Sequence, residues 1–212
     1  MARSPRLDPR PVFLPPERPA YRSHVVVERA LTPGQCDRVV ALGSRWRADE
    51  ATLAGEASGA ADPALRRSTV TWLPPEDDTE WLFERLAAVD ERANRQWDFE
   101  LTGFGEDLQL TAYDRPGSFY TWHQDGLDGE VATRKLAVVV QLTDPATYEG
   151  ADLELFDVVA DLDDEALAAW TDRCRVRGTA VVFPAFEYHR VTPLRAGVRH
   201  SLVAWVSGPP FR

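Results

Sequence analysis

Two segments in the first half of the chain carry apolar residues at the three- and four-residue spacing of an amphipathic helix. The longer one covers residues 80–97, and its apolar stripe consists of Leu82, Leu86, Val89 and Ala93. The shorter one begins at a capping box formed by Thr32 and Gln35, with Pro33 at the first helical position and Gly43 as the expected end. The pattern therefore predicts two helices, the first of which we expect to pack on a sheet.

Beyond residue 99 the pattern changes to short strands separated by turns that contain glycine or proline. The predicted strands are residues 108–113, 136–142, 152–155, 179–183 and 199–206, in addition to residues 24–27 and 68–73 of the first half. Residues 136–140 are continuously apolar, so we expect that strand to be buried on both faces. A succession of short strands of this kind is typical of a β-sandwich or a β-barrel.

An acidic helical segment, residues 161–174, interrupts the strands of the second half. Its predicted inward face consists of Leu162, Ala166, Ala169 and Trp170. Two interpretations of this insertion stay open: a solvated surface helix, which we favour, and a lid over a substrate. At the N-terminus, six prolines within residues 1–21 predict an extended arm, because proline blocks the hydrogen bonds of helices and sheets.

The composition of the chain argues against some classes of binding partner. The net charge is −10 and the pI is about 4.9, so the chain lacks the electrostatic footprint of a protein that binds nucleic acid or an anionic membrane. No run approaches 18 apolar residues and no apolar stretch follows the N-terminal charges, so we expect neither a transmembrane helix nor a signal peptide. Cys36 and Cys174 stand alone, which favours reduced thiols and a cytoplasmic location.

Candidate chemistry is concentrated at His123, Asp125, His189 and Arg199. His123 and Asp125 are two positions apart, so on a strand their side chains share one face and can reach the same metal ion. His189 follows a predicted strand end, where the mouth of a barrel would lie. Two histidines and one carboxylate form the facial ligand set of non-haem Fe(II), which leaves coordination positions open for a co-substrate and O2.

Five motifs surround these residues. They are Gly117-x-x-Tyr120-x-x-His123-x-Asp125, Gln141-Leu142-Thr143-Asp144-Pro145, Tyr148-Glu149-Gly150, His189-Arg190-Val191-Thr192-Pro193 and Gly197-x-Arg199-x-Ser201. Together they resemble the Fe(II)/2-oxoglutarate-dependent oxygenases, in the prolyl-4-hydroxylase-like, PKHD-type branch. The resemblance runs over residues 24–212 and is most specific in the last two motifs, where a His, a Val-Thr-Pro turn and an Arg follow one another at the family's distances.

The resemblance implies a mainly β fold with flanking helices around a double-stranded β-helix, which is a cupin-like jelly roll. We therefore expect a single oxygenase domain over residues 22–212. Within it, residues 22–98 would provide helical support and residues 99–212 the jelly-roll core.

The resemblance also implies roles for single residues. The metal ligands and catalytic centre would be His123, Asp125 and His189. Arg199 would form a bidentate pair with the C5 carboxylate of 2-oxoglutarate, because a planar guanidinium matches a carboxylate fork. The residues expected to assist at this co-substrate are Tyr113 and Ser201. Those expected to border the substrate are Arg67, Tyr120 and Trp122, with a core position open for Tyr120 and a packing role favoured for Trp122.

The implied reaction is hydroxylation of an unactivated C–H bond with O2 and 2-oxoglutarate, giving succinate and CO2, with ascorbate as a candidate reductant. Asp125 favours hydroxylation over halogenation, because related halogenases have a small residue in place of the carboxylate. The expected substrate is derived from an amino acid, free or peptidyl, and would be selected by residues 51–62, 66–68 and 126–133. The alternatives are a cupin-type metal protein that does not use 2-oxoglutarate, a non-catalytic module, and a desaturase or cyclase reaction.

Overall fold

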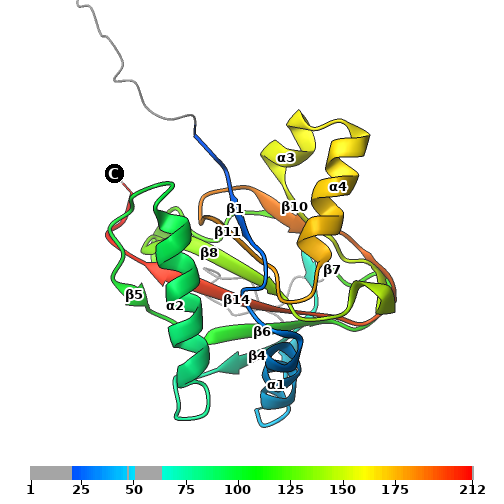
Figure 1. The fold of residues 1–212 in the computed structure, drawn as a ribbon, viewed down its shortest axis with the longest axis horizontal. Helices are drawn as coiled ribbons and strands as arrows, with labels where there is room; N and C mark the ends of the chain where they lie inside the picture. Colours follow the sequence, from blue (N-terminus) through cyan, green and yellow to red (C-terminus); the bar gives the residue numbers. More distant parts are fainter. Residues whose placement is uncertain (1–20, 47, 51–63, 212) are drawn as a thin grey trace, which may run out of the picture.

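The computed structural model describes residues 21–46, 48–50 and 64–211 (Figure 1). The predicted loop at residues 51–62 and, apart from Tyr21, the predicted proline-rich arm lie outside the described residues. None of the described helices combines the length and the apolar character needed to cross a bilayer.

Two antiparallel sheets dominate the described part of the chain. The larger has the order β1 (Val25–Val27), β11 (Ala180–Pro184), β8 (Arg134–Gln141), β14 (Arg199–Ser207), β6 (Leu108–Tyr113), β4 (Thr69–Leu73) and β2 (Asp49–Glu50), with β5 (Gly103–Phe104) paired to β14. The smaller has the order β10 (Leu153–Leu155), β12 (His189–Val191), β7 (Phe119–His123) and β3 (Arg66–Arg67). A two-stranded ribbon joins β13 (Leu194–Gly197) and β9 (Tyr148–Gly150), and short 3-10 turns lie at η1 (Gly129–Val131) and η2 (Pro145–Thr147).

Two antiparallel sheets with helices on the outside are the predicted fold class, a jelly roll with flanking helices. Every strand predicted from the pattern is present, with ends within two residues of the prediction. The short strands β7 and β12 were not among the predicted ones, although they pair directly and carry the two candidate histidines. Strands β1, β3 and β4 also join the sheets, so residues 22–98 contribute more than helical support.

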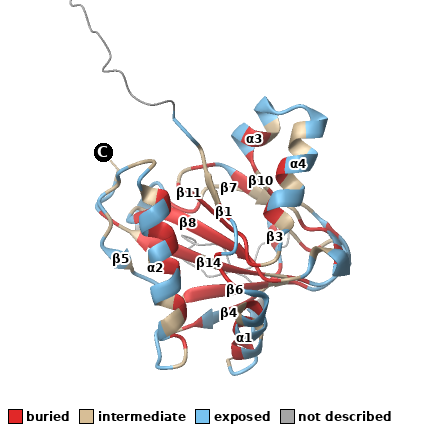
Figure 2. Ribbon diagram, viewed as in Figure 1, coloured by how far each residue is buried: buried red, intermediate tan, exposed pale blue. Residues whose placement is uncertain are grey.

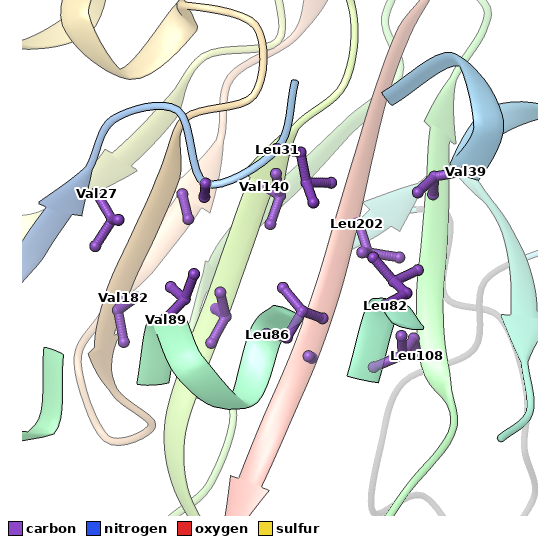
Figure 3. Packing of buried hydrophobic residues seen from close by; sticks show 14 of the residues in the cluster. Val27, Leu31, Val39, Leu82, Leu86, Val89, Leu108, Val140, Val182 and Leu202 are labelled. Atoms are coloured by element: carbon purple, nitrogen blue, oxygen red, sulfur yellow. The ribbon is translucent and has the colours of Figure 1, made fainter. Parts of the chain in front are cut away.

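The outer face of the larger sheet is covered by α1 (Pro33–Gly43) and α2 (Glu80–Asn94), as Figure 1 shows. Figure 3 shows the core beneath them, in which Leu82, Leu86 and Val89 of α2 meet Val140, Val182 and Leu202 of the sheet. The predicted helical stripe is therefore the face that packs on the sheet. Burying each leucine contributes about 1.5–3 kcal/mol, which makes this interface the main attachment of α2.

Strand β8 divides two cores. All eight of its residues are buried, as predicted for the apolar run, and Figure 2 shows this strand buried between its neighbours. Leu136, Val138 and Val140 face the helices, whereas Ala137 and Val139 face the opposite side. Because side chains alternate along a strand, one apolar run serves two different environments. The second of these environments contains the candidate site.

The ends of the two helices follow local signals. The capping box is present at the start of α1: the Thr32 hydroxyl accepts from the Gln35 amide, and the Gln35 side chain accepts from the Thr32 amide. Helix α2 ends at Asn94, three residues before the predicted end, because the chain reverses at Asp98, whose φ is +55°. Trp97 is half-buried against the main apolar cluster, and its indole donates to the Arg22 carbonyl at 2.8 Å.

The acidic insertion consists of two helices, α3 (Phe156–Asp161) and α4 (Asp164–Arg175), instead of the single predicted helix. Helix α4 is capped at its N-terminus by Asp163, whose carboxylate accepts from the Ala166 amide at 2.8 Å. Leu162 precedes this cap, so it lies outside the helix and is exposed, whereas Trp170 and Cys174 of the helix are buried. The predicted inward face was therefore right at Trp170 and wrong at Leu162 and Ala169.

Helix α4 packs on β10 and on the second apolar cluster. The Trp170 indole donates to Nε2 of His24 at 2.9 Å and fixes the helix to the segment before β1. No residue of α3 or α4 lines the cavity of the candidate site described below. The arrangement agrees with the surface-helix interpretation and gives no support to a lid.

Asp90 offers a test of the packing of α2. Its carboxylate is buried, and neither oxygen has a hydrogen-bond partner among the described residues. Burial raises the pKa of Asp90 well above the ordinary value. Between the unfolded and the folded pKa the native state holds a proton that the unfolded state has lost, so stability falls as pH rises through this window. We expect urea unfolding to show a slope of up to about 1.4 kcal/mol per pH unit there, absent in Asp90→Asn.

Glu91→Gln is the matched control, because Glu91 is the next residue on α2 and is exposed. Its pH profile of stability should follow that of the wild-type chain. An unchanged profile in Asp90→Asn would show that the carboxyl of Asp90 finds a partner in solution.

Candidate active site

A cavity of about 510 Å³ lies between the two sheets. The larger sheet contributes the inward, mostly polar positions of β6 and β14, including Gln109, Thr111, Tyr113, Ser201 and Trp205. The smaller sheet contributes Tyr120, His123, His189 and Val191. The cavity therefore occupies the interior of the jelly roll, and its walls alternate along each strand with the apolar residues that pack beneath the helices.

The structure brings His123, Asp125 and His189 together. His123 ends β7, His189 begins β12, and the two residues are directly paired in the smaller sheet. The candidate ligand atoms of all three residues lie within 4.8 Å of one another. Asp125 lies just beyond the strand, not on it as the sequence argument assumed. Its amide donates to the Ala185 carbonyl at 2.9 Å, and this bond holds the turn beside the end of β11.

Hydrogen bonds fix the orientation of both imidazoles. Nδ1 of His123 lies 2.7 Å from the Thr121 carbonyl, and Nδ1 of His189 lies 2.9 Å from the Glu187 carbonyl. A carbonyl only accepts, so Nδ1 carries the proton in each ring and Nε2 keeps a free lone pair. Those Nε2 atoms lie 3.6 Å and 3.5 Å from the Asp125 carboxylate. Both lone pairs are thus directed to the point where a metal ion could bind.

The electrostatics favour the protonation states that a metal needs. Burial and the neighbouring His189 lower the pKa of His123 to about 3, so its ring is neutral. Burial acts to raise the pKa of Asp125, but His189, His123, Trp205 and Arg134 act together in the opposite direction and the pKa is lowered. A metal ion binds neutral imidazoles and an ionised carboxylate. The buried Oδ2 atom of Asp125 has no hydrogen-bond partner in the described structure, so the donor set fits a divalent cation.

Arg199 lies where β14 begins and is directly paired with Tyr113 of β6. Its side chain is 3% exposed, and its guanidinium lies 5.4 Å from the centre of the Tyr113 ring. The Nη1 atom has no acceptor among the described residues. A buried, unpartnered guanidinium nitrogen is costly, so this arginine fits an anion bound beside Tyr113. Ser201 lies two residues further along β14 and lines the cavity on the same face.

Gln141, which the sequence argument did not assign, orients Arg199. Its side-chain oxygen accepts from Nε of Arg199 at 2.9 Å, and its side-chain nitrogen donates to the Tyr148 hydroxyl at 2.9 Å. The available signal was the position of a polar residue at the end of an apolar strand, on the same face as Val139. Gln141 therefore presents the guanidinium in one orientation, in which Nη1 is available to bind an anion.

Gln141→Leu is expected to weaken binding of 2-oxoglutarate about 10- to 100-fold, because a hydrogen bond to a charged group is lost and Arg199 is no longer held in place. Titration of 2-oxoglutarate into the Mn(II)-loaded protein measures the change. Gln96→Leu is the control, since Gln96 follows α2 and does not line the cavity. Equal affinities for Gln141→Leu and the wild-type chain would show that Arg199 keeps its orientation unaided.

A second unassigned residue, Arg134, supports the metal-binding turn. Its Nη1 atom donates to the Asp125 carbonyl at 2.9 Å, and its Nε atom donates to the Glu106 carboxylate at 2.6 Å. The guanidinium lies 3.8 Å from the centre of the Trp205 ring. Trp205 itself is buried, packs in the second apolar cluster and lines the cavity. The backbone of Asp125 is therefore held by an arginine whose charge is neutralised locally.

The residues predicted to border the substrate lie in different places. Tyr120 lines the cavity, and its ring is stacked on His123 with centroids 3.4 Å apart. Trp122 points away, against Phe156 and under Arg190, which is the packing role favoured for it. Arg67 is exposed and does not line the cavity, so this prediction is corrected: successive residues of a strand face opposite sides, and its neighbour Arg66 points inward.

One of the predicted selectivity segments also reaches the cavity. Val131 and Thr133, from the turn at residues 126–133, line it near Arg134. The segment at residues 66–68 contributes Arg66. Substrate selection by these segments stays a prediction.

Fold and site define a class: a jelly roll that holds two histidines and a carboxylate beside a buried arginine. Residues 108–207, a stretch that contains all four of these residues, match the family model of the 2OG-Fe(II) oxygenase superfamily. The resemblance to this superfamily and to its prolyl-4-hydroxylase-like, PKHD-type branch is therefore confirmed.

Two curated relatives are PKHD-type hydroxylases. That of Klebsiella pneumoniae is 31% identical over 96 residues, which are 43% of this chain and 39% of the relative. That of Hyphomonas neptunium is 32% identical over 71 residues, which are 34% of this chain and 28% of the relative. The aligned part of the chain thus spans less than half the length of either relative.

Solved structures share the fold. A Pseudomonas putida prolyl-4-hydroxylase superposes with a TM-score of 0.64 at 18% identity, covering 88% of this chain and 93% of that protein. A Trichoplax adhaerens prolyl hydroxylase, solved with a peptide fragment of the hypoxia-inducible factor, gives 0.65 at 16% identity, covering 87% and 83%. A viral collagen prolyl hydroxylase from Paramecium bursaria Chlorella virus-1, solved with 2-oxoglutarate, gives 0.60 at 16% identity, covering 89% and 97%.

Proposed function

We propose that this protein is an Fe(II)- and 2-oxoglutarate-dependent oxygenase that hydroxylates an unactivated C–H bond. The observation that carries the proposal is that the three candidate metal ligands line an interior cavity and that the buried Arg199 lies beside Tyr113, which lines the same cavity. The proposed ligands of Fe(II) are His123, Asp125 and His189. Arg199, assisted by Tyr113 and Ser201, would bind the C5 carboxylate of 2-oxoglutarate.

When bound, Fe(II) and 2-oxoglutarate supply the oxidation: O2 is consumed, 2-oxoglutarate becomes succinate and CO2, and one oxygen atom is inserted into a substrate C–H bond. The protein supplies binding, orientation and exclusion of water. The carbonyls of Thr121 and Glu187 hold the Nδ1 protons of the two histidines, so both rings keep their metal-binding tautomer. Arg134 holds the turn that carries Asp125.

The proposed substrate is derived from an amino acid, either free or within a peptide. A relative of the same fold was solved with a peptide fragment, and the PKHD-type relatives are named as hydroxylases. We also propose a cytoplasmic location with ascorbate as reductant. The free, buried thiols of Cys36 and Cys174 are compatible with a reducing compartment.

The test is formation of succinate from 2-oxoglutarate by the Fe(II)-loaded protein, across a panel of free amino acids, peptides and small metabolites. We expect turnover that depends on both Fe(II) and 2-oxoglutarate and that rises with the correct substrate. A cupin-type protein without 2-oxoglutarate chemistry would bind metal, yet addition of 2-oxoglutarate would leave its metal spectrum unchanged. That outcome, or failure to bind a divalent metal, would overturn the proposal.

A further inference from the structure

The cavity contains a buried cation that the proposed function does not use. Arg66 of β3 is 7% exposed and lines the cavity. Its Nε atom donates to the Ser68 hydroxyl at 2.9 Å. Its guanidinium lies 4.5 Å from the centre of the Tyr120 ring.

Within the described part of the chain, no carboxylate lies within ion-pair distance of the Arg66 guanidinium. The other charged residues of the cavity are accounted for: Arg134 pairs with Glu106, and Asp125 belongs to the proposed metal site. A hydroxyl and an aromatic face do not neutralise a guanidinium. Burying an unpaired cation costs free energy, and a bound anion would offset this cost. The terminal nitrogens of Arg66 are therefore a candidate binding position for an anion.

This position is close to the triad. The rings of Tyr120 and His123 are stacked with their centroids 3.4 Å apart, and Arg66 is paired with Tyr120 across β3 and β7. The Arg66 guanidinium lies 4.5 Å from the centre of the Tyr120 ring, and this ring is in direct contact with the His123 ring. Tyr120 is therefore the one side chain that links Arg66 to the triad in this chain of contacts. In a molecule whose anionic group binds Arg66, a carbon atom held beside the triad would be only a few covalent bonds away from that group.

We propose that Arg66 binds a carboxylate of the primary substrate, and that this substrate is a small free carboxylic acid of the amino-acid class instead of a residue within a peptide chain. The inference rests on the proposed function. The C5 carboxylate of 2-oxoglutarate has its own partner in Arg199, which lies on the opposite sheet. A residue inside a peptide has no main-chain carboxylate to offer, whereas a free acid always has one.

The net charge of −10 acts against an anionic substrate only at long range. Surface charges are screened beyond about 8 Å at physiological ionic strength. A charge-assisted hydrogen bond inside a cavity is formed at contact distance and is screened far less. The local arginine therefore decides the charge preference of the site, and the acidic surface affects mainly the rate of approach.

The experiment uses the full chain loaded with Mn(II) and saturated with 2-oxoglutarate. Mn(II) accepts the same nitrogen and oxygen ligands as Fe(II), and it broadens the NMR lines of molecules bound near it. The probes are propionate and its uncharged analogue propionamide. We expect propionate lines to be broadened about ten- to a hundredfold more than those of propionamide at equal concentration, the ratio expected for one charged hydrogen bond. Arg66→Gln should remove this difference, and Arg66→Lys should restore part of it.

Arg67→Gln is the matched control, because Arg67 is the next residue of β3 and is exposed, so it should retain the wild-type preference. Broadening of 2-oxoglutarate itself serves as the internal reference for folding and for the metal site. If 2-oxoglutarate is not broadened in the wild-type chain, the proposed function fails. If it is broadened but propionate and propionamide behave alike, or Arg66→Gln keeps the preference, only the assignment of Arg66 is overturned. Loss of 2-oxoglutarate broadening in Arg66→Gln with folding intact would make Arg66 a co-substrate residue and overturn the assignment as well.

Discussion

Replacing Asp125 or His189 by alanine is expected to abolish turnover and to lower the affinity for Fe(II) by well over 100-fold. Loss of a residue that only hydrogen-bonds to a metal ligand typically costs about 10- to 100-fold, and here one of three anchoring ligands disappears. Equilibrium dialysis with metal analysis gives the affinity, and succinate formation gives the turnover.

Unfolding is not the expected cause of this loss. Asp125 is 8% exposed, and its Oδ2 atom has no hydrogen-bond partner in the described residues, so the carboxylate contributes little to the stability of the metal-free chain. The melting temperature of Asp125→Ala should therefore stay close to that of the wild-type chain without metal. His200→Ala is the control for His189→Ala, because His200 lies outside the triad. Full metal binding and turnover in His189→Ala would refute the assignment of the triad.

Arg199→Ala is expected to raise the requirement for 2-oxoglutarate between about 30-fold and several thousand-fold. Removing one partner of a desolvated charge pair costs about 2–5 kcal/mol, and 1.4 kcal/mol corresponds to a factor of ten. Arg199→Lys should recover only part of the affinity, because an ammonium group cannot reproduce the planar fork that pairs with a carboxylate. The apparent KM for 2-oxoglutarate and its direct Kd in the Mn(II)-loaded protein are the two measurements.

Arg195→Ala is the control for the loss of a positive charge. Arg195 lies four residues before Arg199 on the exposed ribbon strand β13, and its nearest carboxylate, that of Glu149, is 3.9 Å away. Its affinity for 2-oxoglutarate should match that of the wild-type chain. An unchanged 2-oxoglutarate dependence in Arg199→Ala would mean that another cation holds the carboxylate, with Arg66 as the first candidate.

The sequence predicted correctly those helices and strands that are stabilised by interactions between residues close together in the chain. The capping box at Thr32, the stripe of α2 and the apolar run of β8 depend on side chains a few positions apart, so their patterns predict their elements. The short strands β7 and β12 escaped prediction because three to five residues carry too little periodicity, and pairing with other strands makes them strands at all. The inward face of the acidic insertion was predicted wrongly at Leu162 because the cap Asp163 starts a new helix after that residue, and packing on β10 buries Trp170 and Cys174 of that helix.

The sequence by itself indicated the chemistry proposed for this protein: His123, Asp125 and His189 indicated an iron site, and the resemblance of the surrounding motifs to 2-oxoglutarate-dependent oxygenases implied the co-substrate and its arginine. Only the tertiary structure decided which residues hold the candidate ligands in place and which further side chains face the cavity. It selected Arg66 over Arg67 as the residue that faces the cavity, and it placed Gln141 against Arg199. These contacts join residues far apart in the chain, and the direction of each side chain depends on strand register, which is set by the packing of the whole sheet.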